Sequence, residues 1–223
     1  MDKTEYKQYI KLNEIIKLKQ RILEISYKYK LSHLSSCLGS LPIIYNIFIN
    51  KNENEKFILS NGHSGLALYV ILEHFFNYNA EELYLKHGIH PCFDPEHQIW
   101  CTTGSLGIGL PIAIGYALST PYKICCLISD GECYEGSIWE SLAFIKEYNI
   151  LNININVIVN GLSAYKKINI NYLENRLLSF YEKIIIHKIE NIKELPFSSG
   201  LDQHYHILSE NEYFTARRLC ENA

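Results

Sequence analysis

Apolar residues recur at helical spacing along the first part of the chain. Residues 4–30 carry leucine and isoleucine three or four positions apart, with lysine and glutamate between them, and this pattern predicts one long amphipathic helix. A break is predicted over residues 31–39, and a second helix over residues 40–49, with Pro42 in its first turn, where proline is tolerated. The charged stretch of residues 50–56 predicts a loop.

Short apolar runs then alternate with helical patterns along the rest of the chain. The runs predict strands over residues 57–59, 123–129, 155–160, 184–189 and 204–208. The helical patterns cover residues 66–76, 103–118, 136–148, 173–180 and 210–220. Strands that alternate with helices favour a parallel sheet covered on both faces. We therefore predict an α/β fold, a doubly wound, mostly parallel sheet with helices on both faces, formed as a single domain over residues 1–223.

Composition narrows the class of protein. The 223 residues are 48% hydrophobic with a formal net charge of −3, which excludes a disordered chain and offers no excess positive charge for nucleic acid or an anionic membrane. The longest apolar run, residues 106–118, is shorter than the about 20 residues that a membrane span needs. The N-terminus is too polar for a signal peptide, and none of the 7 cysteines forms a CxxC pair. We expect a soluble cytoplasmic protein.

Two polar residues follow predicted strands, at the positions where parallel sheets bind ligands. Asp130 comes directly after the strand over residues 123–129, and Asn160 ends the strand over residues 155–160. Neighbouring strands would place an acidic oxygen and an amide oxygen side by side, and such oxygens suit Mg²⁺ that also holds a diphosphate. Taken alone, however, this pair is explained better by an Asp-Gly turn and an asparagine in a loop.

Longer motifs around these residues resemble those of the transketolases. SDGECYEGSIWE followed by VIVNGLSAY resembles the thiamine diphosphate signature, in which an Asp-Gly pair closes one strand and an asparagine begins the next loop. LSHLSSCLGS, KFILSNGHSGLALY, and IHP with TTGSLGIGLPIAIGYAL resemble the family's three histidine motifs, in the family's order. The motifs span residues 31–165, more than half of the chain. The sequence is therefore similar to the cofactor domain of a transketolase.

The resemblance implies thiamine diphosphate as the cofactor, held through Mg²⁺ or Ca²⁺. The implied metal ligands are the side chains of Asp130 and Asn160 and the backbone carbonyl of Leu162. The implied cofactor-binding residues are His63, Gly104, Ser105, Leu106, Gly131, Glu132 and Asn160, of which Gly131 and Glu132 belong to the diphosphate loop. His33 and His90 are the implied catalytic residues, since imidazole can move the hydroxyl protons of a two-carbon ketol unit near neutral pH.

The resemblance also implies a partner. Transketolases share their active site between this domain and a second, pyrimidine-binding domain, for which the chain has no room before residue 223. We therefore expect the N-terminal subunit of a split transketolase, a heterotetramer of two copies of this chain and two copies of a C-terminal, pyrimidine-domain subunit. The expected reaction transfers a two-carbon ketol unit from a ketose or ketose phosphate to an aldose, so the expected ligands are small sugars or sugar phosphates.

One family feature is missing near the end of the chain. Nothing after His206 resembles the glycine-rich segment that brings a further active-site histidine to the cofactor. Histidines outside the motifs are expected to be ordinary core or surface residues, although His204 or His206 could replace the missing one. The histidines in this group are His74, His87, His97, His187, His204 and His206. The departure favours a specialised substrate, such as a sugar for a surface polysaccharide, over the common pentose phosphates.

Two alternatives remain open at this point. One is a subunit similar to 1-deoxyxylulose-phosphate synthase or to another pyruvate-using thiamine enzyme, which would release carbon dioxide from pyruvate. The other is a non-catalytic cofactor-binding or regulatory subunit, and the presence of Asp130, Asn160 and three motif histidines argues against it. A nicotinamide-binding Rossmann domain is disfavoured, because GSLGIG at residues 104–109 does not fit the G-x-G-x-x-G spacing.

Overall fold

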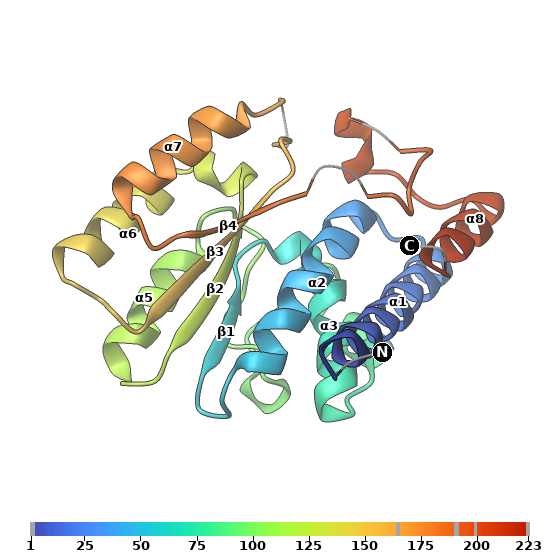
Figure 1. Ribbon diagram of the computed structural model, residues 1–223, viewed down its shortest axis with the longest axis horizontal. Helices are drawn as coiled ribbons and strands as arrows, with labels where there is room; N and C mark the ends of the chain where they lie inside the picture. The colour runs from blue at the N-terminus through green and yellow to red at the C-terminus, as the bar shows by residue number, and fades with distance from the viewer. Residues whose placement is uncertain (1–2, 164–165, 190–191, 199, 222–223) are drawn as a thin grey trace.

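Four parallel strands form one sheet in the described part of the computed structural model, which covers residues 3–163, 166–189, 192–198 and 200–221. The strands are β1 (Lys56–Leu59), β2 (Ile124–Ser129), β3 (Ile153–Val159) and β4 (Ile185–Lys188), and they lie in the order β1-β2-β3-β4 (Figure 1). Each pairing is parallel. The predicted α/β fold with a parallel sheet is confirmed.

Helices cover both faces of the sheet, as predicted. One face carries α1 (Lys3–Tyr29), α2 (Leu34–Asn50), α3 (Gly65–Phe76), α4 (Ala80–His87) and α8 (Glu210–Glu221). The other carries α5 (Gly109–Ser119), α6 (Gly136–Glu147) and α7 (Ile170–Phe180) (Figure 1). Because successive strand residues point to opposite faces, Leu127 of β2 enters the first core, whereas Cys126 and Ile128 enter the second.

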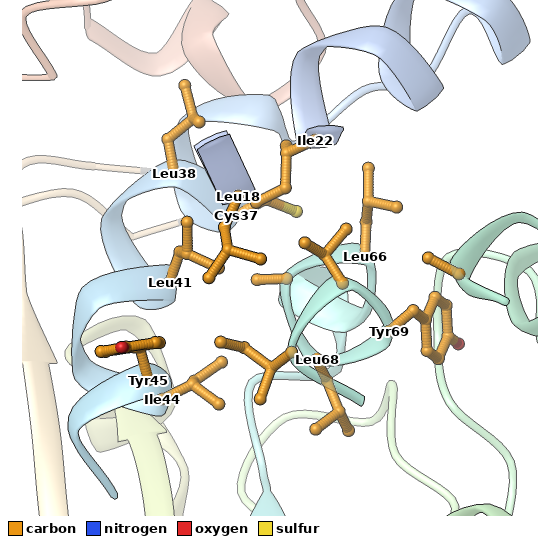
Figure 2. Close-up of a cluster of buried hydrophobic side chains, with 14 of the residues drawn as sticks. Leu18, Ile22, Cys37, Leu38, Leu41, Ile44, Tyr45, Leu66, Leu68 and Tyr69 are labelled. Atoms are coloured by element: carbon orange, nitrogen blue, oxygen red, sulfur yellow. The ribbon is translucent and has the colours of Figure 1, made fainter. Parts of the chain in front are cut away.

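The first core holds α2 firmly between the sheet and the outer helices. Figure 2 shows its centre, where Leu18 and Ile22 of α1 lie together with Leu41 of α2 and Leu66 of α3. Burying one such aliphatic side chain contributes about 1.5–3 kcal/mol. This packing fixes α2, whose first turn begins at the carboxyl edge of the sheet, where the candidate site lies.

The adjacent strands β2 and β3 set the geometry of that edge. Their register pairs Ser129 with Ile158, so the residues that follow the two strands, Asp130 and Asn160, leave the sheet beside each other. Apolar and β-branched residues dominate both strands, as expected for strands buried on both faces. The prediction that Asp130 and Asn160 follow neighbouring strands is confirmed.

Helix α2 begins within the stretch that the sequence pattern predicts as a break. Its first turns contain small residues that are poor helix formers, but they are buried against the sheet. A Cβ atom added to Gly39 would lie 3.4 Å from the Ile192 side chain and 3.6 Å from that of Ile158. The start of the helix is therefore packed against these side chains, and tertiary packing overrides local propensity.

Three further elements differ from the predictions. Helix α5 begins at Gly109 instead of residue 103, because residues 103–108 still belong to the irregular loop between α4 and α5. Helix α4 was not predicted, although Asn79 accepts hydrogen bonds from the backbone N–H groups of its first turn. The strand predicted over residues 204–208 is wrong. Leu208 packs into the first core. No strand of the described residues pairs with residues 204–208.

None of the helices in the described residues combines the length and the apolar character that crossing a bilayer requires.

Candidate functional site

A cavity of about 180 Å³ opens at the carboxyl edge of the sheet. Its lining comes from the segments that follow β1, β2 and β3, the first turns of α2, and the segment that precedes α8. Open parallel sheets bind ligands at this edge. The lining residues are His33, Ser36, Ser40, Asn61, His63, His90, Gly104, Leu106, Ser129, Asp130, Gly131, Ile158, Asn160, Leu162, Ser163, His204 and Tyr205.

Asp130 connects the ends of the two central strands. Its side chain is almost fully buried, and its Oδ1 atom accepts a hydrogen bond from the Gly131 N–H at 3.0 Å. Its Oδ2 atom accepts from the N–H groups of Asn160 at 3.0 Å and Gly161 at 2.8 Å. The carboxylate therefore fixes the loop after β3 against the turn after β2.

Asn160 and Leu162 bring further oxygen atoms to the same place. The Oδ1 atom of Asn160 accepts a hydrogen bond from the Leu162 N–H at 2.9 Å, which shapes the loop locally. The Leu162 carbonyl oxygen lies 4.0 Å from the position of a Cβ atom added to Gly131, so it is near the turn that carries Asp130. A carboxylate, an amide oxygen and a backbone carbonyl are the donors that Mg²⁺ and Ca²⁺ prefer.

The electrostatics of the site also favour a bound cation. Burial raises the pKa of Asp130 to about 6, although hydrogen bonds from Gly161, Asn160 and Gly131 act in the opposite direction. No lysine or arginine is among the described residues that line the cavity. A divalent cation would supply the missing positive charge and stabilise the ionised carboxylate. The residues present therefore fit the predicted metal ion.

Histidines from distant parts of the chain also line the cavity. The ring centroid of His33 lies 5.4 Å from that of His63 and 5.9 Å from that of His204. Burial, and then the neighbouring histidines, lower the pKa of His33 to about 4 and that of His63 to about 3. Both imidazoles are therefore neutral near neutral pH, the state in which a histidine can either accept or donate a proton.

His90 reaches the cavity on the irregular loop between α4 and α5. A Cβ atom added to Gly104 would lie 3.2 Å from Cγ of His90, so this imidazole packs directly on the Gly104 backbone. Gly104 has a φ of 138°, in the region that favours glycine. Leu106, two residues further on, also lines the cavity. The loop therefore brings Gly104 and Leu106, which are predicted to bind the cofactor, to the cavity together with His90, a predicted catalytic residue.

Two predicted cofactor-binding residues point elsewhere. The Ser105 side chain is exposed and does not line the cavity. Glu132 is fully buried and does not line the cavity. Its carboxylate accepts hydrogen bonds from the Ser60 hydroxyl at 2.5 Å, the Gly107 N–H at 3.0 Å and the Ser129 N–H at 2.8 Å. Glu132 therefore joins the ends of β1 and β2 to the loop before α5, and any contact with a cofactor would come from its backbone.

His204 and Tyr205 are site residues that the sequence motifs missed. The backbone N–H of His33 donates to the His204 carbonyl at 2.9 Å, and the Nε2 atom of His204 is buried with no hydrogen-bond partner among the described residues. His206 faces away and lies 3.2 Å from a carboxylate oxygen of Glu212. The absent glycine-rich segment was the only sequence signal that directed attention to this histidine pair.

Asn61 is a further polar residue that the motifs did not single out. Its Nδ2 atom donates to the hydroxyls of Ser40 at 3.2 Å and Ser64 at 3.0 Å, which holds the side chain in place. Its Oδ1 atom is buried and has no partner among the described residues. This oxygen is therefore available as an acceptor for a ligand that enters the cavity.

The fold and the cavity together define an α/β protein with a candidate ligand site at the carboxyl ends of its parallel strands. The crystal structure of a transketolase from Campylobacter jejuni matches the fold with a TM-score of 0.69 at 18% identity, covering 93% of this chain and 43% of that one. A transketolase from Leishmania mexicana matches with a TM-score of 0.62 at 16% identity, covering 95% of this chain and 44% of that one.

Sequence comparison leads to the same family. The mouse transketolase-like protein 2 is 35% identical over 143 residues, which are 54% of this chain and 23% of that protein. One subunit of the apulose-4-phosphate transketolase of Phocaeicola vulgatus is 32% identical over 158 residues, which are 61% of this chain and 56% of that protein. No family model matches the chain. The chain is similar to transketolases in sequence and in fold, and the resemblance seen in its motifs is confirmed.

The extent of these matches limits what they establish. The chain spans about a quarter of the length of the full-length transketolase relatives and about half of the Phocaeicola vulgatus relative. The matches therefore show similarity to part of these relatives in sequence and in fold.

Proposed function

We propose that this chain is the cofactor-phosphate-binding subunit of a two-chain, thiamine diphosphate- and Mg²⁺-dependent transketolase. The enzyme would transfer a two-carbon ketol unit from a ketose or its phosphate to an aldose. The observation that carries this proposal is the single cavity that combines the oxygen donors of Asp130, Asn160 and Leu162 with His33, His63 and His90. A relative whose name describes it as one subunit of a transketolase supports the two-chain arrangement.

The oxygen donors would hold the metal ion and, through it, the cofactor diphosphate. Asp130 and Asn160 would ligate with their side chains and Leu162 with its backbone carbonyl. Gly131 lies beside these donors, since a Cβ atom added there would be in van der Waals contact with Ser163 at 3.7 Å and with the Leu162 carbonyl oxygen at 4.0 Å. The chemistry that thiamine diphosphate supplies when bound is the stabilisation of negative charge on the carbon that is transferred.

The histidines would handle the protons of the sugar hydroxyls. His33, His63 and His204 lie within one cluster, and His90 faces it from the loop that packs on Gly104. A neutral imidazole can accept a hydroxyl proton as a carbon–carbon bond breaks and return it as the new bond forms. The low pKa values of His33 and His63 keep the neutral form populated throughout the physiological range.

Calorimetric titration of thiamine diphosphate with Mg²⁺ tests the proposal. The chain is titrated alone and mixed with the candidate pyrimidine-domain subunit, and Asp130→Ala is compared with Glu147→Ala, an exposed carboxylate at the end of α6. Binding that appears or tightens with the partner, persists in Glu147→Ala and is lost in Asp130→Ala supports a split thiamine enzyme. Absence of binding in both settings would instead favour a non-catalytic subunit.

The reconstituted pair then decides the substrate class. Ketol transfer from a ketose to an aldose supports the transketolase reaction, whereas carbon dioxide release from pyruvate would favour a pyruvate-using enzyme. Rapid turnover of xylulose 5-phosphate with ribose 5-phosphate would exclude the proposed specialised sugar. Sedimentation of the same mixture tests whether the assembly contains two copies of each chain.

A further inference from the structure

The loop that carries His90 connects α4 to α5, and its two legs run side by side and are joined by hydrogen bonds. Its two legs are joined by hydrogen bonds from the Thr103 N–H to the Pro91 carbonyl at 3.0 Å and from the Phe93 N–H to the Thr102 hydroxyl at 2.9 Å. Asp94 and Ile99 exchange two backbone hydrogen bonds, at 2.8 and 3.0 Å. The path of the loop is therefore defined along its whole length, from the cavity to its outer tip.

Asp94 lies at the outer tip and is buried there, with 7% of its surface exposed. Its Oδ2 atom contacts Nζ of Lys86 at 2.7 Å, Nε2 of His87 at 3.1 Å and Nδ1 of His97 at 2.8 Å. Lys86 and His87 belong to the last turn of α4, whereas His97 belongs to the short 3₁₀ turn Pro95–His97 of the loop itself. One carboxylate oxygen thus joins the loop tip to the preceding helix.

Aromatic residues hold the two histidines of this cluster in place. The Tyr69 ring of α3 stacks on His87 with centroids 6.0 Å apart, and its hydroxyl donates to the Gly88 carbonyl at 3.1 Å. The Tyr78 ring packs edge-on against His97 at 4.9 Å, and its hydroxyl donates to the Glu96 carbonyl at 2.9 Å. The tip is therefore anchored to α3 and α4, elements that belong to the first core.

The inner end of the loop has little freedom to adjust. A Cβ atom added to Gly65, at the start of α3, would lie 2.4 Å from the Ile89 carbonyl oxygen and 3.0 Å from Pro91. His90, between these two residues, packs on Gly104 of the other leg. A shift of either leg would therefore displace the His90 ring from the cavity wall.

We infer that Asp94 is a positioning residue, which holds the loop so that His90 stays against Gly104 at the edge of the cavity. The inference deepens the proposed function and rests on it for the role of His90 in ketol transfer. The bracing itself is a property of the chain that can be measured without any activity.

The charges of the cluster are consistent with this role. Burial raises the pKa of Asp94, but the hydrogen bonds from Lys86 and His97 outweigh burial and leave that pKa below its ordinary value. Asp94 is therefore an anion near neutral pH, paired with the Lys86 cation. Without this carboxylate, Lys86, His87 and His97 would lose their shared hydrogen-bond acceptor. Leaving a side chain as buried as His87 without that partner would cost free energy of folding.

Hydrogen–deuterium exchange tests the bracing directly. The variants are Asp94→Ala and the milder Asp94→Asn, which keeps one acceptor oxygen, with Glu96→Gln as a control because it removes an exposed carboxylate from the same turn. In Asp94→Ala, the amides of residues 94, 99 and 103 should exchange roughly 10- to 100-fold faster, since the loss of a charged hydrogen-bond acceptor favours local opening. Asp94→Asn should be intermediate and Glu96→Gln unchanged.

Kinetics of the reconstituted enzyme test the link to His90. If Asp94 acts through His90, Asp94→Ala should lower kcat. The double variant Asp94→Ala/His90→Ala should then have the same kcat as His90→Ala alone. The imidazole resonances of His90, assigned by their loss in His90→Ala, should move in Asp94→Ala and largely return in Asp94→Asn. A purely structural role would leave the two kinetic losses additive and the His90 resonances in place.

The outcomes separate this inference from the proposed function. Unchanged exchange and unchanged His90 resonances in Asp94→Ala would overturn the inference, even if the enzyme is an active transketolase. Faster loop exchange and displaced His90 resonances would support the bracing even if the reconstituted chain bound no thiamine diphosphate, and in that case only the proposed function would fail. If Asp94→Ala does not fold, the same readouts on Asp94→Asn decide.

Discussion

At the scale of single residues, folding shifts the pKa values of several side chains in the candidate site. The pKa of His33 falls from 6.5 to about 4 and that of His63 from 6.5 to about 3, whereas the pKa of Asp130 rises to about 6 and the pKa of Glu132 is also raised. Between pH 6.5 and 4, unfolding therefore takes up protons at the histidines and releases them at the acids. As the pH falls, the histidines therefore lower the free energy of unfolding, whereas the two acids raise it. The pH dependence of a single variant is more informative than that of the unchanged chain, in which these effects partly cancel.

We predict that His33→Gln gains stability relative to the unchanged chain as the pH falls from 6.5 towards 4. In the unchanged chain, the pKa of His33 is 6.5 in the unfolded state and about 4 in the folded state. Between these two pH values only the unfolded state binds the proton, so the free energy of unfolding decreases as the pH falls. Urea denaturation of both proteins at several pH values measures the difference. A difference that stays constant over this range would show that His33 is not held neutral in the fold.

A second residue-scale prediction concerns His204, which lines the cavity with a ring nitrogen that has no partner among the described residues. Replacement by glutamine should lower kcat of the reconstituted enzyme by about tenfold or more, because a positioned imidazole contributes this much or more to proton transfer. His206→Gln is the matched control, since His206 lies two residues away and contacts Glu212 outside the cavity. Equal effects of the two variants would contradict a specific role for His204.

At the scale of elements, the site is built by contacts between strand ends and loops that are distant in sequence. Glu132 is the central example, because it accepts hydrogen bonds from Ser60 after β1, Gly107 before α5 and Ser129 at the end of β2. The loop that carries Gly104 and Leu106 is therefore fixed to the sheet by a carboxylate that lies outside the cavity.

We predict that Glu132→Gln lowers the free energy of unfolding by about 1–3 kcal/mol, because an amide nitrogen would face backbone N–H donors and leave one of them unsatisfied. Glu135→Gln removes an exposed carboxylate three residues later and should have little effect. Chemical denaturation of the two variants provides the measurement. Similar stabilities for both would mean that the buried network does not hold the loop.

The same contacts explain which elements the sequence could predict. The strands and α6 have strong local patterns, and their order and parallel pairing follow from the alternation of strand and helix. The start of α2 could not be predicted in this way, because Gly39 and its small neighbours are poor helix formers that are buried by packing in the fold. The start of α5 was placed too early because Gly104 and Gly107 adopt positive φ angles of 138° and 79°, which keep this segment out of a helix.

For the candidate site, motifs were more informative than hydrophobic pattern. They located Asp130, Asn160, Leu162 and the three histidines that line one cavity. They could not show that the Glu132 side chain turns away from it, because this depends on three partners brought together only by folding. His204 was missed as a site residue because its approach to His33 joins opposite ends of the chain.

At the scale of the whole molecule, the site lies where the two cores meet at the edge of the sheet. The first core fixes α2 with His33, and the second fixes α5 and α6 behind β2 and β3. Asp130 holds the ends of β2 and β3 together through the Asn160 and Gly161 amides. A ligand at this point therefore contacts segments from both halves of the fold, and its binding should stabilise the molecule as a unit.

We therefore predict that thiamine diphosphate with Mg²⁺ raises the thermal unfolding temperature of the chain in the presence of its partner. At a ligand concentration 100-fold above the dissociation constant, binding to the folded state adds about 2.7 kcal/mol, which corresponds to roughly 5–10 °C for a domain of this size. Asp130→Asn should lose most of this shift, whereas Glu147→Gln should keep it. Calorimetric scans with Mg²⁺ alone, cofactor alone and both together measure the shift. If Asp130 ligates the cation, cofactor without Mg²⁺ should give little stabilisation, and an equal shift without the metal would contradict this role.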